Sequence, residues 1–360
     1  MKVAVIGTVG LPANYGGFET LVEQLVRHNR NENLQYVVYC SNKSYTNKQR
    51  DYQGAKLEYI GLEANGIQSI PYDIISLIRA SRKNDIILIL GVSGCAFLPV
   101  FRLFSKKKLI INIDGLEHRR DKWNKWVRKF LKFSEKQAVK YGDIIVTDNK
   151  GITDYVYEEY GKSSELIAYG GDHVLTEINE DLTDKVLTKY ELRKEEYALG
   201  ICRIEPENNV HLILEAFEKA NKKIVFIGNW TKNEFGRQLA GKYKNSEYVR
   251  ITSAVYDLDI LNVLRSNCNL YLHGHSAGGT NPSLVEAMFF SKPIIAYDCI
   301  YNRESTESKA HYFKSVEDLQ YIIGLPSSEF TENAKNMAAI ANRRYKWTTI
   351  AKQYEQQYSS

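Results

Sequence analysis

Short apolar segments alternate with amphipathic helical patterns along the whole chain, and this alternation is the strongest constraint on its fold. Continuous apolar runs such as IILIL at 86–90 and IIV at 144–146 are typical of parallel strands that are buried on both faces. Between such runs lie helical patterns such as Phe18–His28, in which apolar residues recur on one face. The alternation predicts an α/β protein with parallel sheets.

The alternation forms two successive series, and each series predicts a doubly wound, Rossmann-like domain with a ligand cleft between the two. A chain of 360 residues also exceeds one typical hydrophobic core. The polar stretch Thr176–Lys194 lacks a strong apolar period, so we expect a linker there. The predicted strands are Lys2–Ile6, Gln35–Cys40, Leu57–Ile60, Asp85–Leu90, Lys108–Ile113, Asp143–Thr147, Glu165–Ala168, Tyr197–Ile201, Lys223–Ile227, Tyr248–Ile251, Leu270–His273 and Pro293–Tyr297. The predicted helices include Asn209–Ala220, Asn233–Tyr243, Asp257–Ser266, Pro282–Phe290 and Tyr345–Tyr358.

The composition excludes several classes of protein. With 44% hydrophobic and 25% charged residues, the chain has the make-up of an ordinary globular protein. It contains no apolar run of about 18 residues and no recognisable secretion signal, so we expect no membrane span. The 5 cysteines are scattered and form no Cys-x-x-Cys pair, which is typical of free thiols in the cytoplasm.

The motif HGHSAGGTNPSLVEAM joins a glycine-rich loop to a clear helix start. Asn281 and Pro282 are residue types favoured at the N-cap and at the first helical position. Gly278 and Gly279 would let the backbone approach a ligand closely. Glu286 is a solitary carboxylate in an otherwise apolar helix, and its burial without partners would be costly. Either the hydroxyls of a sugar or ribose bind to it, or it is solvated or paired with a nearby arginine.

The loop GTVGLPANYGGF follows the first strand. It is longer than a usual connection from a strand to a helix, which has about two to six residues. It contains Gly7, Gly10, Gly16 and Gly17, and the helix that follows points its positive end toward it. The spacing fits neither the dinucleotide fingerprint nor a P-loop. The loop therefore predicts a ligand contact, with a long glycine-containing turn as the alternative.

Charged residues follow the predicted strand that ends at Ile113, in the sequence NIDGLEHRRDKW. Asp114 at the strand's carboxyl end is placed to orient or deprotonate an acceptor hydroxyl, with Glu117 and His118 beside it. The alternative is an Asp-Gly turn that caps the next helix. A histidine in such a polar segment is more often a surface residue than a catalytic one, and we expect this of His118.

Arg203 follows the first strand of the second series, where its guanidinium could grip a diphosphate by paired hydrogen bonds. Asn208 and Asn209 are predicted to open the next helix and to aim its N–H groups at the same spot. The two glycines in Tyr169–Asp172 indicate a hinge, a ligand contact or a simple turn. Asp257-Leu258-Asp259 precedes an apolar helix, so a helix cap is favoured there over a metal site. No cluster of zinc-ligand type appears elsewhere, and the chain is predicted to need no metal.

Two segments of the first series combine lysine and arginine with large apolar side chains. They are FRLFSKKK at 101–108 and RRDKWNKWVRKFLK at 119–132. Cationic residues with interfacial aromatics favour docking on an anionic membrane surface, whereas the alternative is a solvated helix with an ordinary core face. A nucleic-acid partner is not expected, because no recognition motif is present.

Together these segments resemble the retaining, nucleotide-sugar-dependent glycosyltransferases of the GT-B fold, in the family-four group. The resemblance covers nearly the whole chain. GTVGLPANYGGFETLVEQL, NIDGLE, CRIEPENN and GGTNPSLVEAM resemble the bacterial rhamnosyltransferases of capsule and cell-wall polysaccharide synthesis. The ending YKWTTIAKQYEQQY resembles the family's terminal crossover helix. The resemblance implies an acceptor-binding domain at 1–170, completed by the crossover helix 345–360, and a nucleotide-sugar-binding domain at 171–344.

The resemblance also implies roles for particular residues. Glu286 matches the second glutamate of the family's Glu-x7-Glu motif, which holds the ribose, and Arg203 matches the residue that contacts the donor diphosphate. Two positions depart from the family pattern, because the first glutamate is Gly278 and the usual lysine is Asn208. The implied donor-binding residues are Gly16, Gly17, Arg203, Asn208, Gly278, Gly279, Thr280, Asn281 and Glu286. The implied acceptor-binding residues are Asp114, Glu117 and His118, with Asp114 and Arg203 in catalytic roles.

The expected activity is transfer of a sugar, L-rhamnose from dTDP-rhamnose, to a polyprenyl-diphosphate-linked saccharide with retention of configuration. We expect no cofactor, and a cytoplasmic enzyme docked on the inner membrane face. Three alternatives stay open: a UDP-sugar donor, a nucleotide-sugar epimerase and a non-catalytic sensor of sugar nucleotides. An epimerase would need acid and base groups around one sugar, and a sensor would bind a donor without turnover.

Overall fold

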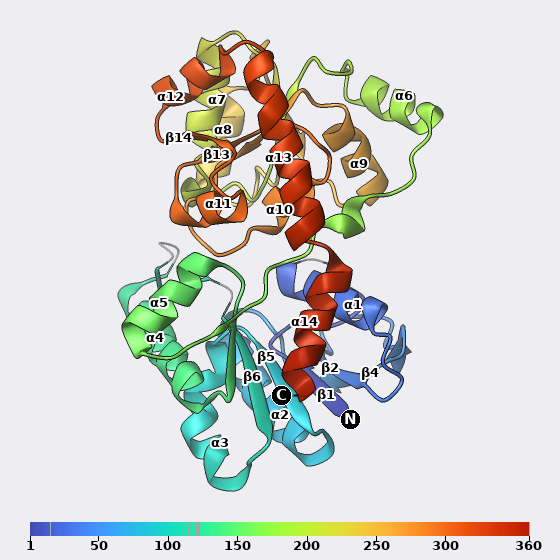
Figure 1. Cartoon of the computed structure of the whole chain (residues 1–360), viewed down its shortest axis with the longest axis vertical. Coiled ribbons are helices and arrows are strands. Elements are labelled where there is room, and N and C mark those ends of the chain that lie inside the picture. The colour runs from blue at the N-terminus through green and yellow to red at the C-terminus, as the bar shows by residue number, and fades with distance from the viewer. Residues whose placement is uncertain (15, 114, 120–122, 360) are drawn as a thin grey trace. The chain divides into compact units, whose positions relative to one another are not determined.

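A computed structural model describes residues 1–14, 16–113, 115–119 and 123–359. The chain divides into two compact units (Figure 1). Unit 1 comprises Met1–Tyr169 and Trp347–Ser360, and unit 2 comprises Gly170–Lys346. Each unit is an α/β domain with its own sheet, which confirms the predicted fold class.

Unit 1 is built on an eight-stranded sheet in the order β3-β4-β2-β1-β5-β6-β7-β8. The neighbouring strands are parallel except for the short β3, which pairs antiparallel with β4. The central strands are buried on both faces, because their side chains are almost entirely aliphatic. The strands are β1 (Lys2–Ile6), β2 (Gln35–Ser41), β3 (Asp51–Tyr52), β4 (Ala55–Ile60), β5 (Ile86–Leu90), β6 (Lys108–Ile113), β7 (Ile144–Thr147) and β8 (Glu165–Leu166).

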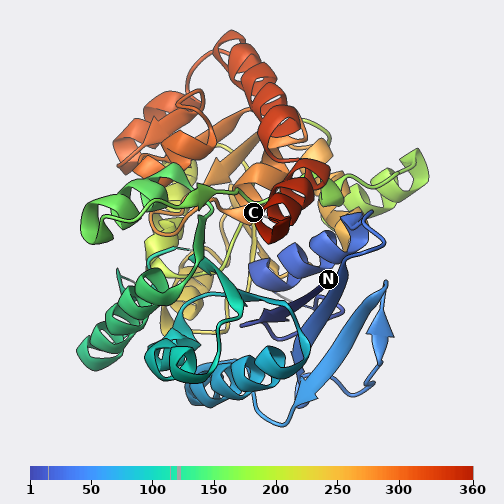
Figure 2. The same cartoon turned by 60° about the horizontal axis from the view of Figure 1, so that its bottom comes forward.

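Helices cover both faces of this sheet. The helices α2, α3 and α4 each pack on the 3-10 turn η2, and α3 also packs on α4. On the other hand, α1 packs on the final helix α14. Figure 2 shows the red α14 beside the blue α1. The elements are α1 (Gly17–His28), η1 (Gly66–Gln68), α2 (Ser69–Lys83), η2 (Ser93–Phe97), α3 (Leu98–Phe104), η3 (Glu117–Arg119), α4 (Lys125–Tyr141), α5 (Lys150–Tyr160) and α14 (Trp347–Ser359).

The chain's last helix is anchored to unit 1 by its aromatic side chains. The hydroxyl of Tyr354 accepts a hydrogen bond from Asn112 Nδ2 at 2.5 Å, and Asn112 belongs to β6. The ring of Trp347 meets the ring of Tyr169 with centroids 4.8 Å apart. The expected return of the C-terminal helix to the first domain is therefore confirmed.

Unit 2 has a six-stranded sheet of parallel strands in the order β11-β10-β9-β12-β13-β14. Its strands are β9 (Ala198–Ile201), β10 (Ile224–Gly228), β11 (Val249–Ser253), β12 (Leu270–His273), β13 (Ile294–Tyr297) and β14 (His311–Phe313). Its helices are η4 (Asp172–Val174), α6 (Glu180–Lys189), η5 (Pro206–Asn208), α7 (Val210–Lys219), α8 (Glu234–Lys242), α9 (Leu258–Ser266), α10 (Pro282–Met288), α11 (Ile300–Ser305), α12 (Val316–Ile323) and α13 (Ser328–Arg344).

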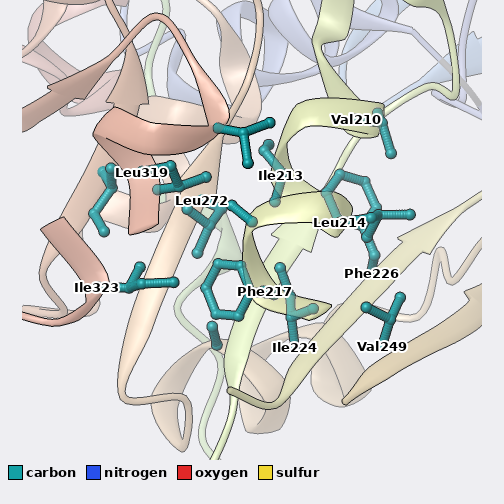
Figure 3. Close-up of a cluster of buried hydrophobic side chains, with 14 of the residues drawn as sticks. Val210, Ile213, Leu214, Phe217, Ile224, Phe226, Val249, Leu272, Leu319 and Ile323 are labelled. Atoms are coloured by element: carbon teal, nitrogen blue, oxygen red, sulfur yellow. The ribbon is translucent and has the colours of Figure 1, made fainter. Parts of the chain in front are cut away.

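A hydrophobic core fills the space between this sheet and the helices α7, α8 and α12. Phe217 of α7, Phe226 of β10 and Leu319 of α12 all belong to it and are buried (Figure 3). Burial of such side chains contributes about 1.5–3 kcal/mol each relative to exposure. The core holds the strands in place and so fixes the loops that leave their carboxyl ends.

All of the predicted strands are present, and their ends differ from the predicted ones by at most 2 residues. Two short strands, β3 and β14, escaped prediction because two or three residues carry too little periodicity. The predicted linker Thr176–Lys194 was wrong. Its central part is α6, which buries Thr183, Val186 and Leu187 and packs on α9. The helix α13, which ends just before the final helix, was not predicted either.

Candidate functional site

Two loops at the carboxyl edge of the unit 2 sheet are linked to each other by hydrogen bonds. Asn209 follows β9, and its Nδ2 donates to the carbonyl oxygen of Gly274, which follows β12, at 2.9 Å. Ser276 donates to the carbonyl oxygen of Glu207 from its backbone N at 3.0 Å and from its Oγ at 2.8 Å. A Cβ on Gly274 would lie 2.1 Å from the carbonyl oxygen of Asn208, so only glycine permits this approach. Ligands of open α/β sheets bind at this edge.

Arg203 lies on the first of these loops with its side chain exposed. Among the described residues, its guanidinium makes no hydrogen bond or ion pair. The buried Asn208 donates from Nδ2 to the Arg203 carbonyl oxygen at 2.7 Å and so fixes the backbone at this position. The guanidinium is thus available to an anionic ligand, and its backbone is held in place.

Asn209 precedes α7 as its N-cap residue, as predicted, whereas Asn208 ends the 3-10 turn η5. Asn209 has a left-handed backbone with φ 49°, and its side chain makes no capping hydrogen bond. Both amides instead bind backbone carbonyl groups of the joined loops. These amide contacts were not predicted, because an Asn at a helix start is expected to cap the helix with its side chain, although Asn also tolerates the left-handed conformation of a turn.

The second loop leads into α10, which begins where the sequence predicts. Asn281 is the N-cap, and its Oδ1 accepts hydrogen bonds from Ser283 N at 3.1 Å and from Ser283 Oγ at 2.9 Å. Pro282 is the first helical residue. Gly278 has a positive φ of 116°, and Thr280 is buried. The predicted donor-binding residues Gly278, Gly279, Thr280 and Asn281 therefore lie on one loop, beside the loop that carries Arg203.

Glu286 of α10 is paired with an arginine, which is the alternative that the sequence left open. Its Oε2 accepts a hydrogen bond from Arg265 Nη2 at 2.6 Å, and its Oε1 lies 3.6 Å from His173 Nε2. The Arg265 side chain is 3% exposed and the Glu286 side chain is 15% exposed. Two further nitrogens of Arg265, Nε and Nη1, are buried and make no hydrogen bond to described residues. Glu286 therefore keeps limited access to solvent, while Arg265 fixes its orientation.

Gly171 of the AYGGD segment permits close packing against α10. A Cβ on Gly171 would lie 2.9 Å from the backbone carbon and oxygen of Val285. The backbone N of Gly171 also donates to the carbonyl oxygen of Tyr345 at 2.8 Å. This packing brings His173 to the Glu286 carboxylate.

His273 at the end of β12 is buried, and neither ring nitrogen has a hydrogen-bond partner among the described residues. Its ring stacks on His275 with centroids 4.5 Å apart. Desolvation lowers the pKa of His273 from 6.5 to about 3, so the imidazole is neutral at physiological pH. The burial of His273 could not be predicted, because a histidine at the end of an apolar strand is compatible with either exposure or burial.

The free energy of unfolding should fall as the pH drops below 6.5, because unfolded His273 then binds a proton that folded His273 refuses until about pH 3. The contribution is about 1.4 kcal/mol per pH unit over that window. We expect His273→Asn to remove this part of the slope. Urea unfolding at several pH values between 7 and about 4 measures both slopes. Parallel slopes for the wild type and the variant would rule out a buried neutral His273.

In unit 1, the predicted glycines Gly16 and Gly17 lie at the start of α1. Glu19 in the first turn of this helix is buried and binds back to the loop, accepting from Thr8 Oγ1 at 2.8 Å and from Val9 N at 2.7 Å. Gly16 has a positive φ of 118°, and a Cβ there would lie 2.1 Å from Glu19 Oε2. The glycine-rich loop is therefore folded onto the helix start.

The loop after β6 carries the other predicted residues. Asp114 lies outside the described residues. Glu117 Oε2 accepts a hydrogen bond from Trp123 Nε1 at 3.2 Å. His118 is not the expected surface residue, because its side chain is 13% exposed and its Nδ1 lies 2.9 Å from Glu135 Oε2. Such an Nδ1 contact fixes the ring and directs Nε2 away from the carboxylate.

Glu135 of α4 is the centre of a buried polar cluster that the sequence analysis missed. Its Oε1 accepts hydrogen bonds from the hydroxyl of Tyr155 at 2.7 Å and from that of Tyr160 at 2.6 Å. Lys132 Nζ lies 3.5 Å from the same oxygen. Burial raises the pKa of Glu135, but the hydrogen bonds from His118, Tyr160 and Tyr155 outweigh this and lower the pKa below 4.5. Glu135 is therefore ionised at neutral pH and orients His118.

Asp257 has the capping role that the sequence favoured. Its Oδ1 accepts hydrogen bonds from Asp259 N at 2.9 Å and from Ile260 N at 3.1 Å. Within the described ranges, no group of three or more His, Cys, Asp or Glu side chains could hold a metal ion. No helix in the same ranges is both long and apolar enough to cross a membrane.

Two family models match the chain. One, described as a domain of unknown function (DUF1972), matches residues 1–172. The other, described as glycosyl transferases group 1, matches residues 184–314. No curated protein sequence matches.

Several solved structures share the fold of the whole chain. Sucrose-phosphate synthase from Thermosynechococcus elongatus is 14% identical, with a TM-score of 0.80, and the match covers 99% of this chain and 98% of that one. Anabaena Alr3699/HepE in complex with UDP is 13% identical, with a TM-score of 0.78 and full coverage of 100% of both chains. The same Anabaena protein in complex with UDP-glucose is 12% identical, with a TM-score of 0.77 and coverage of 99% of each chain.

The family match lies on the unit that contains Arg203 and Glu286, and the fold match extends over both units. Residues 184–314 therefore match the glycosyl transferases group 1 model, in a chain that has the GT-B fold.

Proposed function

We propose that this protein transfers a sugar from a nucleoside diphosphate sugar to an acceptor hydroxyl. The observation that carries the proposal is the exposed Arg203 guanidinium, which has no partner among the described residues. It lies on a loop joined to the Gly278–Asn281 loop, at the carboxyl edge of a domain that matches the glycosyl transferases group 1 model. A free cation beside a glycine-rich loop suits a diphosphate.

In the proposed donor site, Arg203 binds the diphosphate and Glu286 accepts hydrogen bonds from the ribose hydroxyls. Arg265 keeps the Glu286 carboxylate in one orientation, so less conformational freedom is lost when the ribose binds. In the transfer, the bond from the sugar C1 to the diphosphate oxygen breaks, and a bond from C1 to the acceptor oxygen forms on the same face. The departing diphosphate takes the acceptor proton, and Arg203 stabilises its growing charge. No metal or cofactor takes part in this scheme.

We propose L-rhamnose from dTDP-rhamnose as the donor. Gly278 and Asn208 stand where the related enzymes have a glutamate and a lysine, which suits a 6-deoxy sugar with fewer hydroxyls to recognise. A UDP-sugar is the second candidate, because similar structures contain UDP and UDP-glucose. For the acceptor we propose a polyprenyl-diphosphate-linked saccharide on the inner membrane face, bound by unit 1 through Asp114, Glu117 and His118.

Membrane contact of unit 1 is proposed from its cationic and apolar surface. Trp126 in α4 is 79% exposed, and Lys129 of the same helix lies over its ring at 5.4 Å. Lys125 is exposed beside it. An aromatic ring with adjoining cations suits the interface of an anionic bilayer, where a lipid-linked acceptor is found.

The donor and the reaction type can be tested together. Purified protein is incubated with dTDP-rhamnose, UDP-glucose, UDP-N-acetylglucosamine or GDP-mannose, with and without a lipid-linked saccharide. Nucleoside diphosphate release that needs the acceptor and is fastest with dTDP-rhamnose supports the proposal. Isomerisation of a donor without acceptor identifies an epimerase instead, and binding without turnover identifies a sensor. If nucleoside diphosphate release is faster with UDP-glucose than with dTDP-rhamnose, the donor sugar is glucose and not rhamnose.

We expect His118→Ala to raise the KM for the acceptor about tenfold or more, because a well-placed hydrogen bond to a substrate contributes about 1.4 kcal/mol. Glu135→Gln should raise the acceptor KM by a smaller factor than His118→Ala does. It should also shift the pH profile of kcat/KM, because the charge that orients His118 is lost. Steady-state kinetics with both substrates varied measures these effects.

The control is Glu159→Gln, since Glu159 is a half-exposed carboxylate whose Oε1 lies 2.9 Å from the same Lys132. It should leave both KM values and the pH profile unchanged. An unaltered acceptor KM in His118→Ala, with the protein folded, would remove His118 from the acceptor site.

A further inference from the structure

A cationic pocket lies between the end of α2 and the end of α3 in unit 1. Figure 1 draws α2 in cyan and α3 in teal. Its volume is about 470 Å³. The lining includes Arg82 of α2 and Lys106 and Lys107 of the segment that follows α3. Ser81, Ser105 and Phe104 also contribute. The lining contains no carboxylate, so the pocket is formed by three cationic side chains with hydroxyl groups beside them.

The three cations are available to a ligand. Arg82 and Lys106 are exposed and Lys107 is half-buried. In the part of the chain that the structure describes, none of the three side chains makes an ion pair or a hydrogen bond. The hydroxyl of Ser105 is nearly buried and accepts only a long contact of 3.4 Å from Lys107 N, so its proton can be donated. Cations with a hydroxyl donor suit a phosphate group, which accepts several charge-assisted hydrogen bonds.

The surface next to the pocket is apolar. Leu103 is 84% exposed, Phe104 is 57% exposed and Val100 is 49% exposed, although all three are large hydrophobic residues. Their spacing of three and four residues places them on one side of α3. An anionic bilayer surface presents an acyl region and a layer of phosphate groups. Exposed apolar residues that adjoin cations can contact both.

We propose that this pocket binds the phosphate headgroup of an anionic phospholipid while Leu103 and Phe104 enter the acyl-chain region. The inference rests on the membrane contact proposed above but not on the transfer reaction. Residues 104–107 precede β6, so the pocket lies at the amino edge of the sheet. The predicted acceptor residues follow β6 at the opposite, carboxyl edge. A bound lipid headgroup would therefore leave those residues uncovered.

The test is sedimentation with vesicles of phosphatidylcholine alone or mixed with phosphatidylglycerol. The variant Arg82→Ala/Lys106→Ala/Lys107→Ala should lower partitioning onto the anionic vesicles at least tenfold, since each cation near the surface contributes about 1 kcal/mol. The matched control Arg193→Ala/Lys232→Ala/Lys244→Ala removes one arginine and two lysines, all exposed, from unit 2. It should bind almost as well as the wild type. Leu103→Ser/Phe104→Ser should also weaken binding, but with less dependence on salt.

The outcomes separate the headgroup pocket from the wider proposal. Equal losses in the pocket variant and the control would overturn the pocket and leave only a general attraction of positive charge. Loss of vesicle binding in Lys125→Ala/Trp126→Ala, with none in the pocket variant, would keep the membrane contact and overturn the headgroup site. Binding of soluble glycerol phosphate by the wild type, without any binding to vesicles, would overturn the lipid assignment. Donor binding should be the same in all these variants, so a wrong donor assignment would not disturb this test.

Discussion

Replacing Arg203 with alanine should lower kcat/KM for the nucleotide-sugar donor by about 100- to 1000-fold, the usual effect of removing one preorganised donor from a developing charge. The affinity for the free nucleoside diphosphate should fall as well, because the guanidinium contacts the diphosphate before and after transfer. Stability should change by less than about 0.5 kcal/mol, since the side chain is exposed and has no partner among the described residues. Calorimetric titration and initial rates measure the two effects.

Arg203→Lys should recover part of the loss, because an ammonium group keeps the charge but cannot make the paired hydrogen bonds of a guanidinium. Arg193→Ala is the control, since Arg193 is exposed in the same unit and precedes β9 at the other edge of the sheet. It should behave as the wild type. Unchanged diphosphate affinity in Arg203→Ala would remove this residue from the donor site.

Gly274→Ala should destabilise unit 2 by about 3 kcal/mol, the upper part of the range for inserting atoms into a packed region. The added Cβ would lie 2.1 Å from the carbonyl oxygen of Asn208 and 3.0 Å from Ile213 Cδ1. The two loops must then separate, and Asn208 loses its hold on the backbone of Arg203. We therefore expect donor affinity to fall together with stability, as measured by urea unfolding and calorimetric titration.

The matched control is Gly241→Ala in α8, where a Cβ would meet no atom within 4 Å. Its stability should be unchanged or slightly raised, because alanine is favoured over glycine inside a helix by about 1 kcal/mol. If Gly274→Ala were as stable as this control, the close contact between the two loops would not exist in solution.

The parts of the site that depend on local chemistry could be predicted from the sequence. Asn281 and Pro282 specify the start of α10 on their own, because a cap and a first-turn proline act within a few residues. The apolar runs likewise predicted the central strands and hence the edge at which Arg203 lies. The position of Gly278 on the loop before α10 followed from its closeness in sequence to Asn281.

The parts that depend on distant pairing could not be predicted. Glu286 is separated by 21 residues from Arg265, and a single arginine in the last turn of a helix usually indicates only a favourable dipole interaction. Glu135 is likewise 17 residues from His118 and 25 from Tyr160, on another helix. Contacts of this kind depend on how helices pack, which periodicity within one helix does not determine.

Hydrogen exchange in the presence and absence of dTDP or UDP tests the central claim most directly, because the claim concerns where on unit 2 the nucleotide binds. With nucleotide bound, we expect slower exchange in segments 203–209 and 274–286, at the carboxyl edge of the sheet. A cavity of about 740 Å³ at the amino edge, lined by Lys223, Ser327 and Phe330 among others, offers the competing location. Protection confined to segment 323–334 beside that cavity, with segments 203–209 and 274–286 unchanged, would contradict the account.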